Sequence, residues 1–169
     1  PSKSIVALGQ TYFALQSRRQ ELEDDRRLTL REEMKTHNKN LASAAKQAGV
    51  IQPIDYAIFQ NSGYKGLYGG LTATDIKARK KLKKSEDILD HMGSEELAAN
   101  LFRATQTEAK LKREGIVGKD KANQTHFQVG EKVRETIREL GGTMPEKLPK
   151  PDKSIKALKS EKRKALPQE

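Results

Sequence analysis

Apolar residues recur at helical spacing along most of this chain, whereas no stretch alternates over the length of a half-buried β-strand. Only 34% of the 169 residues are hydrophobic and 5% are aromatic, which is a small supply for a deep compact core. We therefore predict an all-α fold. Residues 1–142 are expected to form an elongated multi-helix domain whose N-terminal helices are long. Residues 143–169 are expected to form an extended basic tail, rich in proline and lysine.

Two apolar stripes occupy the first fifty residues and differ in register. The register shifts at the sequence EDDRR, where either two helices join or one long helix contains a stutter. The second stripe ends at Gly49, a natural helix stop, and consists of Leu30, Met34, Leu41, Ala45 and Ala48. The first stripe has heptad-like spacing, so its residues are candidates either for core packing or for self-association: Ile5, Leu8, Tyr12, Leu15 and Leu22.

Helix-start and helix-stop residues divide the middle of the chain into further helices. They are predicted over residues 53–60, 72–84, 94–114 and 119–140. Residues 61–71 contain four glycines and are expected to form a loop. Ser85 is the expected cap of a short additional helix, and Thr72 with Asp75 matches a capping box. In the helix predicted over 53–60 the side chains expected to be buried are Ile54, Ala57, Ile58 and Phe59. In the helix predicted over 119–140 they are Phe127, Val129, Val133, Ile137 and Leu140.

Lysine recurs at every third position of the tail, from Lys147 to Lys162. Polyproline II has three residues per turn, so this spacing would place the lysines along one edge at least as far as Lys153. Beyond that point Ile155, Leu158 and Leu166 permit a short helix.

The residues needed for most kinds of catalysis are absent from the sequence. There is no cysteine, so disulfides, thiolate metal sites and cysteine nucleophiles are excluded. The three histidines lie far apart, and no metal-ligand spacing includes them. The glycine-rich segment lacks the lysine and hydroxyl of a P-loop, because Leu71 follows Gly70. We predict neither an enzyme nor a cofactor.

The charge of the chain points toward a polyanionic partner. Its net charge is +10, and nucleic acid is the commonest polyanion inside cells. Two basic sets are the candidate nucleic-acid-binding residues. The densest basic run consists of Lys77, Arg79, Lys80, Lys81, Lys83 and Lys84. The second set lies on the polar face of the helix predicted over 94–114 and consists of Arg103, Lys110 and Arg113. Glu86 and Asp87 could instead neutralise the basic run internally. Tyr64 and Tyr68 could stack on bases or belong to the core.

No apolar run approaches the roughly 20 residues that span a bilayer, and no signal-like segment is present. We expect a cytoplasmic protein without a membrane partner. The chain begins with Pro1 rather than methionine, so we expect a piece of a longer protein.

Long motifs of this sequence resemble the bacterial DNA-damage-inducible protein D family along almost the whole chain. They are ALGQTYFALQSRRQEL from Ala7, AIFQNSGYKGLYGGL from Ala57, ILDHMGSEELAANLFRATQTEAKLKREG from Ile88 and THFQVGEKVRETIRELGGTMPEKLP from Thr125. The likeness is to the C-terminal portion of the family. Family members also carry an N-terminal region similar to the DNA-binding domain of phage and baculovirus BRO-type proteins. In the family a longer charged stretch separates the residues that match Asp25 and Arg26, which makes a continuous helix there doubtful.

The resemblance implies induction in the SOS response, a role in DNA damage and repair, and a negative influence on recombinase-driven strand exchange or filament stability. It implies no catalytic residues. The leading hypothesis is a non-enzymatic protein that acts on DNA, including single-stranded DNA, or on a recombinase filament. The alternative is an oligomerisation or protein-interaction module, with DNA binding in the missing N-terminal region.

Overall fold

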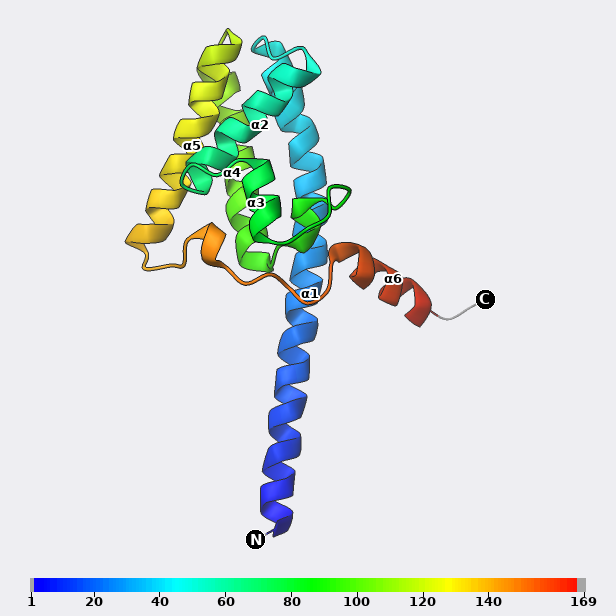
Figure 1. The fold of residues 1–169 in the computed structure, drawn as a ribbon. Helices are drawn as coiled ribbons and strands as arrows, with labels where there is room; N and C mark the ends of the chain where they lie inside the picture. Colours follow the sequence, from blue (N-terminus) through cyan, green and yellow to red (C-terminus); the bar gives the residue numbers. More distant parts are fainter. Residues whose placement is uncertain (1, 167–169) are drawn as a thin grey trace.

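The computed structural model describes the backbone of residues 2–166 and the side chains of these residues except 2–6, 8, 9, 12 and 13. Within this range the fold is all-α, as predicted, and contains no β-strand (Figure 1). The α-helices are α1 (Ser2–Gln47), α2 (Pro53–Leu67), α3 (Ala73–Arg79), α4 (Ser94–Arg113), α5 (Lys119–Glu139) and α6 (Ile155–Ala165). Two 3-10 turns, η1 (Ile88–His91) and η2 (Pro145–Lys147), lie in the connections.

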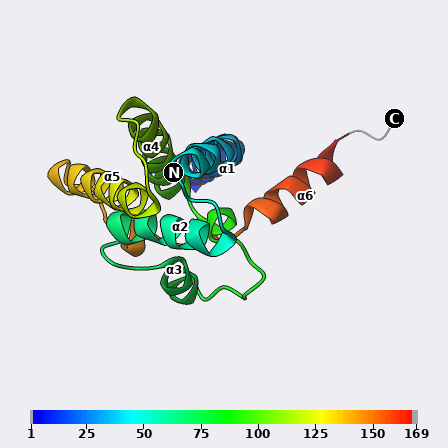
Figure 2. The same ribbon diagram turned by 90° about the horizontal axis from the view of Figure 1, so that it is seen from above.

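The body of the protein is a helical assembly at the C-terminal end of α1. The second half of α1 packs along α4, while α2 crosses α5 (Figures 1 and 2). The first half of α1 extends away from the body as a single helix (Figure 1). In that half Leu15 and Leu22 are 56% and 46% exposed, so they contribute nothing to the core of this chain.

The EDDRR sequence lies inside one continuous helix, so of the two alternatives the single long helix is the one observed, and the doubt raised by the family resemblance does not apply to this chain. Among the side chains of α1 that the structure describes, Arg27 is the first that is buried. From there the apolar stripe that includes Met34 and Leu41 faces the body, whereas the preceding turns project from it. The change of register therefore marks the place where α1 enters the body, and a helix needs no break to change its neighbours.

Helix α2 is twice as long as predicted, because the glycine-rich segment continues it as far as Leu67 instead of forming a loop. The reason is close packing against α5. A Cβ on Gly63 would overlap the ring of His126, and one on Gly130 would lie 2.6 Å from the carbonyl oxygen of Gly63. Glycine thus lets two helix backbones approach each other, and this contact outweighs its low helix propensity. A turn follows only at Gly69 and Gly70, where φ is positive.

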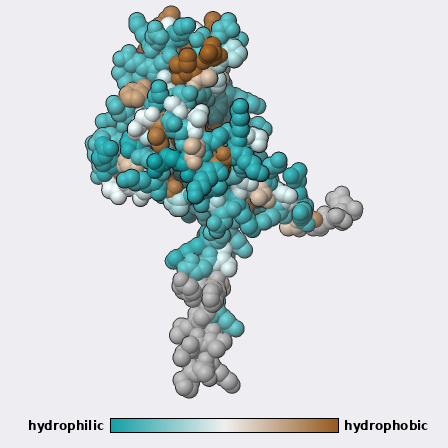
Figure 3. All heavy atoms as spheres, viewed as in Figure 1, coloured by the Kyte–Doolittle hydropathy of each residue, from teal (hydrophilic) through white to brown (hydrophobic). Residues whose placement is uncertain are grey.

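Several predicted core positions are exposed. Helix α2 uses Phe59 and its glycine face for packing, which leaves Ile54 and Ile58 70% and 50% exposed. Figure 3 shows apolar residues gathered at the upper end of the body. In α5, Phe127 is at the rim, and Leu140 follows the last residue of the helix and is 81% exposed.

The core contains a buried polar cluster around Arg103, which is 0% exposed. Its guanidinium donates to Asn100 Oδ1 and, at 2.6 Å, to His126 Nε2, and it lies over the ring of Tyr64. The other ring nitrogen of His126 lies 2.7 Å from the carbonyl oxygen of Phe59, to which it must donate. His126 is therefore a neutral Nδ1–H tautomer, and burial beside Arg103 holds its pKa well below the usual value of 6.5.

The tail packs onto the body. Residues 148–154, which contain no helix or strand and bend at Asp152 and Lys153, precede α6. Arg27 donates to the carbonyl oxygen of Lys153, and Arg134 forms a bidentate pair with Glu146. Ile155 and Leu158 of α6 are buried. In the described residues no helix combines the length and apolar character that a membrane span requires.

Substituting Gly130 by alanine should destabilise the fold. The added methyl group overlaps backbone atoms of α2, which no side-chain rotation relieves, so we expect a loss of about 2–3 kcal/mol in the free energy of unfolding measured with urea. Gly93→Ala is the matched control, since its Cβ would meet only Glu23 Oε1 at 3.5 Å, and it should cost less than about 1 kcal/mol. Equal losses in the two variants would contradict the close-packing account.

The buried neutral His126 predicts a specific pH dependence. Its pKa in the fold lies below its unfolded value, so the unfolded chain binds more protons as the pH falls. Above about pH 6.5 the neutral His126 makes its full contribution to the free energy of unfolding. Below that pH the free energy of unfolding falls by up to about 1.4 kcal/mol per pH unit. Urea unfolding between pH 7.5 and pH 5, in a variant with glutamine at His37 and His91, should show this slope. A flat profile would mean that the pKa of His126 is the same in the folded and the unfolded chain, which would contradict its neutral, buried state.

Candidate nucleic-acid interface

The basic run does not continue α3 to Lys84 as predicted. The helix ends at Arg79, and Lys81 adopts a positive φ of 56°. The backbone N–H groups of Lys81 and Leu82 donate back to the carbonyls of Ala78 and Lys77, which closes the end of the helix. Residues 80–87, here called the basic turn, therefore form an irregular loop, in which Lys81, Lys83 and Lys84 are exposed.

Lys80 is the exception in this turn, because its side chain points into the body. Its ammonium lies 2.8 Å from Glu96 Oε1, and the two side chains are 9% and 1% exposed. The other carboxylate oxygen of Glu96 accepts a hydrogen bond from the Tyr68 hydroxyl. Burial raises the pKa of Glu96, an effect that the Lys80 ammonium opposes, while burial and the nearby carboxylate raise the pKa of Tyr68. Lys80 thus anchors the turn and is not available to a phosphate.

The two carboxylates that could neutralise the turn have other partners. Glu86 accepts the backbone N–H of Lys83 and lies 3.1 Å from the His91 ring; the hydrogen bond from Lys83 lowers its pKa. Asp87 caps η1 in place of the predicted Ser85, and it also contacts Arg31. Within residues 2–166, neither carboxylate forms an ion pair with a lysine of the turn. The turn therefore presents a net positive charge.

The tail extends this positive surface. Lys150 donates to the carbonyl oxygen of Lys80, which places the extended tail beside the basic turn. Figures 1 and 2 show the loop after α3 and helix α6 on the same side of the body. Together the turn, the extended segment and the start of α6 form what we call the basic band. Its exposed members are Lys81, Lys83, Lys84, Lys150, Lys153 and Lys156.

The remaining predicted residues of the basic run lie at its edge. Lys77 is half-buried and donates to the carbonyl oxygen of Lys84, so it supports the turn. Arg79 is exposed, and one of its nitrogens donates to the carbonyl oxygen of Glu146. Both keep their positive charge next to the band, but their hydrogen bonds fix the loop and the tail.

The second predicted basic set is divided by the structure. Arg103 is fully buried, so its assignment to a nucleic-acid surface is wrong; its place on α4 faces α2 and α5. Lys110 and Arg113 do reach the surface, but on the outer side of the α4–α5 pair, away from α3 and α6 (Figure 2). They do not extend the basic band.

The two candidate base-stacking tyrosines are buried, whereas the described leucines of the predicted oligomerisation stripe are exposed. Tyr64 and Tyr68 are 7% and 1% exposed, so they belong to the core and cannot stack on bases. In the proposed oligomerisation stripe the side chains of Ile5, Leu8 and Tyr12 lie outside the described residues. Leu15 and Leu22 are exposed on the projecting half of α1, where a second helix could reach them.

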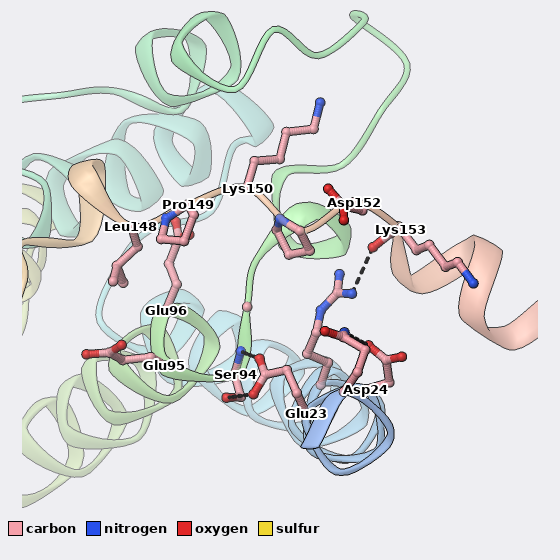
Figure 4. A pocket seen from close by; sticks show the side chains of 14 residues that line it. Glu23, Asp24, Ser94, Glu95, Glu96, Leu148, Pro149, Lys150, Asp152 and Lys153 are labelled. Atoms are coloured by element: carbon pink, nitrogen blue, oxygen red, sulfur yellow. Dashed lines mark hydrogen bonds between the residues drawn. The ribbon is translucent and has the colours of Figure 1, made fainter. Parts of the chain in front are cut away.

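A hollow of about 460 Å³ lies between α1, the start of α4 and the extended tail (Figure 4). Across the hollow, the Glu23 carboxylate accepts hydrogen bonds from the backbone N–H and the hydroxyl of Ser94. Glu23 of α1 thereby caps the N-terminus of α4. Arg27 closes the other side through carbonyl oxygens of Met92 and Lys153. These contacts hold elements together. Among the described residues no group of three or more His, Asp or Glu side chains is arranged to hold a metal ion.

The comparisons with known proteins agree with the resemblance read from the motifs. The chain is 62% identical over 170 residues to the DNA damage-inducible protein D of Escherichia coli strain K12. This match covers 95% of the chain and 62% of the relative's length, so the chain spans somewhat less than two thirds of that protein. No solved structure matches. Residues 22–158 match the family described as the DinD C-terminal domain, and the chain belongs to this family.

Proposed function

We propose that this chain is a non-enzymatic part of the DNA-damage response that binds nucleic acid through the basic band. The damage response is supported by the printed name of the E. coli relative, DNA damage-inducible protein D. Binding through the band is supported by the geometry of residues 80–87 and of the tail. On this proposal the protein acts on DNA or on a recombinase filament formed on DNA, and thereby modulates recombination.

The observation that carries the proposal is the exposure of closely spaced lysines whose neighbouring carboxylates have other partners. Lys81, Lys83 and Lys84 are exposed, while Glu86 and Asp87 contact a backbone N–H, His91 and Arg31. Like charges this close repel one another, and a phosphate backbone would relieve the repulsion and release counterions.

The geometry favours recognition of the backbone over recognition of bases. Lysine ammonium groups on a convex loop can reach phosphates, and the described part of the band contains no exposed aromatic side chain. Phosphate contacts carry no sequence information, so binding should be similar across sequences. A filament in which a recombinase leaves the DNA backbone accessible would offer the same phosphates, and occupation of those phosphates would impede strand exchange.

A second candidate function is self-association or capture of a protein partner along the projecting half of α1. The observation in its favour is that Leu15 and Leu22 are about half exposed on a helix segment that no other described element covers. Isolated helices are marginal in water, so a segment of this kind gains stability from a second helix. Both functions can coexist, because the segment and the basic band use different residues.

Substituting Lys81, Lys83 and Lys84 together by glutamine should weaken binding to a fluorescein-labelled oligothymidylate, measured by anisotropy at two or more salt concentrations. Loss of about three phosphate contacts should lower the slope of log affinity against log salt by about 2. The fold should be unaffected, because all three side chains are exposed. The matched control replaces the exposed lysines Lys35, Lys39 and Lys46 of α1, which removes the same charge elsewhere.

The two variants distinguish a specific surface from the general effect of net charge. Equal weakening in both would indicate that only the overall charge matters, and would argue against the basic band. An unchanged affinity in the band variant would move the contact to another surface. No binding by the unmodified chain would favour the interaction module of α1.

Self-association through α1 has its own test. Replacing Leu15 and Leu22 with serine should shift the chain toward monomer in sedimentation equilibrium, because it removes two apolar side chains from the proposed seam. The exposed Leu140 and Leu166 provide the control pair, since their replacement removes similar apolar surface outside α1. An unmodified chain that is monomeric at high concentration would contradict the second candidate.

A further inference from the structure

The outer side of the α4–α5 pair carries a groove that the basic band does not use. Two hollows of about 260 and 240 Å³ adjoin there and share Phe102, Val133 and Thr136. Figure 2 shows α1 and α6 on one side of this helix pair and α2 and α3 below it, so no described helix covers the outer side. The two adjoining hollows are together called the α4–α5 groove.

One end of the groove is apolar. Phe102 is 52% exposed, although it is an aromatic residue on a helix whose neighbouring positions Leu97 and Ala104 are fully buried. The same hollow is lined by Ala98, Ala99 and Ile137 and, from the tail, by Pro145 and Leu148; its polar lining residues are Glu95, Thr136 and Thr143. An aliphatic hollow with a half-exposed phenyl ring suits a large apolar side chain better than it suits water.

The other end of the groove is cationic. Lys110, Arg113 and Lys132 line it together with the amides of Gln106 and Gln128. Glu114 lies 3.8 Å from the Lys110 ammonium, at the limit of an ion pair, and among the described residues Arg113 and Lys132 form no ion pair. In this half of the groove Arg113 and Lys132 thus carry positive charge without an ion-pair partner among the described residues, while Lys110 is only loosely paired.

We propose that this groove binds a short acidic segment of a partner protein that carries a large apolar side chain. The apolar side chain would pack on Phe102, and the carboxylates would lie at Lys110, Arg113 and Lys132. The charge complementarity is specific to this end, since Arg113 can form bidentate bonds with a carboxylate and the two amides can bond to peptide groups. Apolar burial supplies affinity, and the cations set the direction of the peptide.

The walls argue for a peptide over a nucleic acid. Single-stranded nucleic acid is bound by successive aromatic platforms along a basic track, whereas the groove has one exposed aromatic ring and several aliphatic walls. The groove is also on the opposite side of the body from α6 and the basic turn (Figure 2). It therefore provides a second contact that is independent of the proposed nucleic-acid surface.

The test is an NMR titration of the isotope-labelled chain with a short peptide of alternating glutamate and aspartate that ends in Leu-Phe. Backbone resonances of residues 98–113 and 128–137 should shift, and those of residues 80–87 should not. Phe102→Ala should weaken binding about tenfold, the loss typical of a central apolar contact. The control Leu140→Ala removes an exposed apolar side chain outside the groove and should leave affinity unchanged.

Two further arms make the outcome decisive. The peptide with lysine in place of its acidic residues should fail to bind, and replacing Lys110, Arg113 and Lys132 with glutamine should abolish the salt dependence of the acidic peptide. Since these side chains are at the surface, a folded variant is expected and circular dichroism verifies it. Absence of shifts in the groove, or equal binding of the basic peptide, would overturn the proposal. So would an oligothymidylate that shifts the groove residues and displaces the acidic peptide, because the groove would then be a nucleic-acid site.

Discussion

The hydrogen bond between Arg103 and His126 is the interaction on which the rest of the structure depends. It joins α4 to α5 inside the core, and His126 in turn donates to the backbone of α2, so three helices meet at one neutral imidazole. A buried guanidinium is costly unless its donors are satisfied. Asn100 Oδ1 accepts two of these donors. The Asn100 amide donates to the Tyr68 hydroxyl, which donates to Glu96, and Glu96 accepts from Lys80. The chain of contacts that satisfies the core therefore ends at the basic turn, whose position is fixed from within.

The sequence predicted the class of fold and most helices, because helical periodicity and stop residues are local signals. It failed where tertiary packing overrides them. Gly63 and Gly66 suggest a loop by propensity, yet they are required where α2 touches α5. Arg103 has the spacing of a surface residue on α4, and nothing local shows that Asn100 and His126 will bury it. Lys80 looks like its neighbours in the run, but a partner sixteen positions later, Glu96, turns it inward.

The candidate sites, like the fold, could be predicted only in part from the sequence. Charge density singled out the run from Lys77 to Lys84, and within it Lys81, Lys83 and Lys84 are exposed, although on a turn and not on the predicted helix. It did not reveal that Lys150 lies beside them, because that contact is between residues seventy positions apart. Phe102 carries no local signal of a site, because a phenylalanine that follows Leu101 on an amphipathic helix is typical of a core residue. Only its exposed position between α4 and α5 indicates a binding groove.

The fold thus separates two surfaces around one buried network, with the basic band on one side and the α4–α5 groove on the other. Their separation means that occupation of one leaves the other accessible. The most direct test of the central claim is to map the contact of a single-stranded oligonucleotide by NMR. The account predicts that backbone resonances of residues 80–87 and 148–156 shift together, and that the shifts vanish at high salt. Shifts confined to α1, or their absence at low salt, would contradict it.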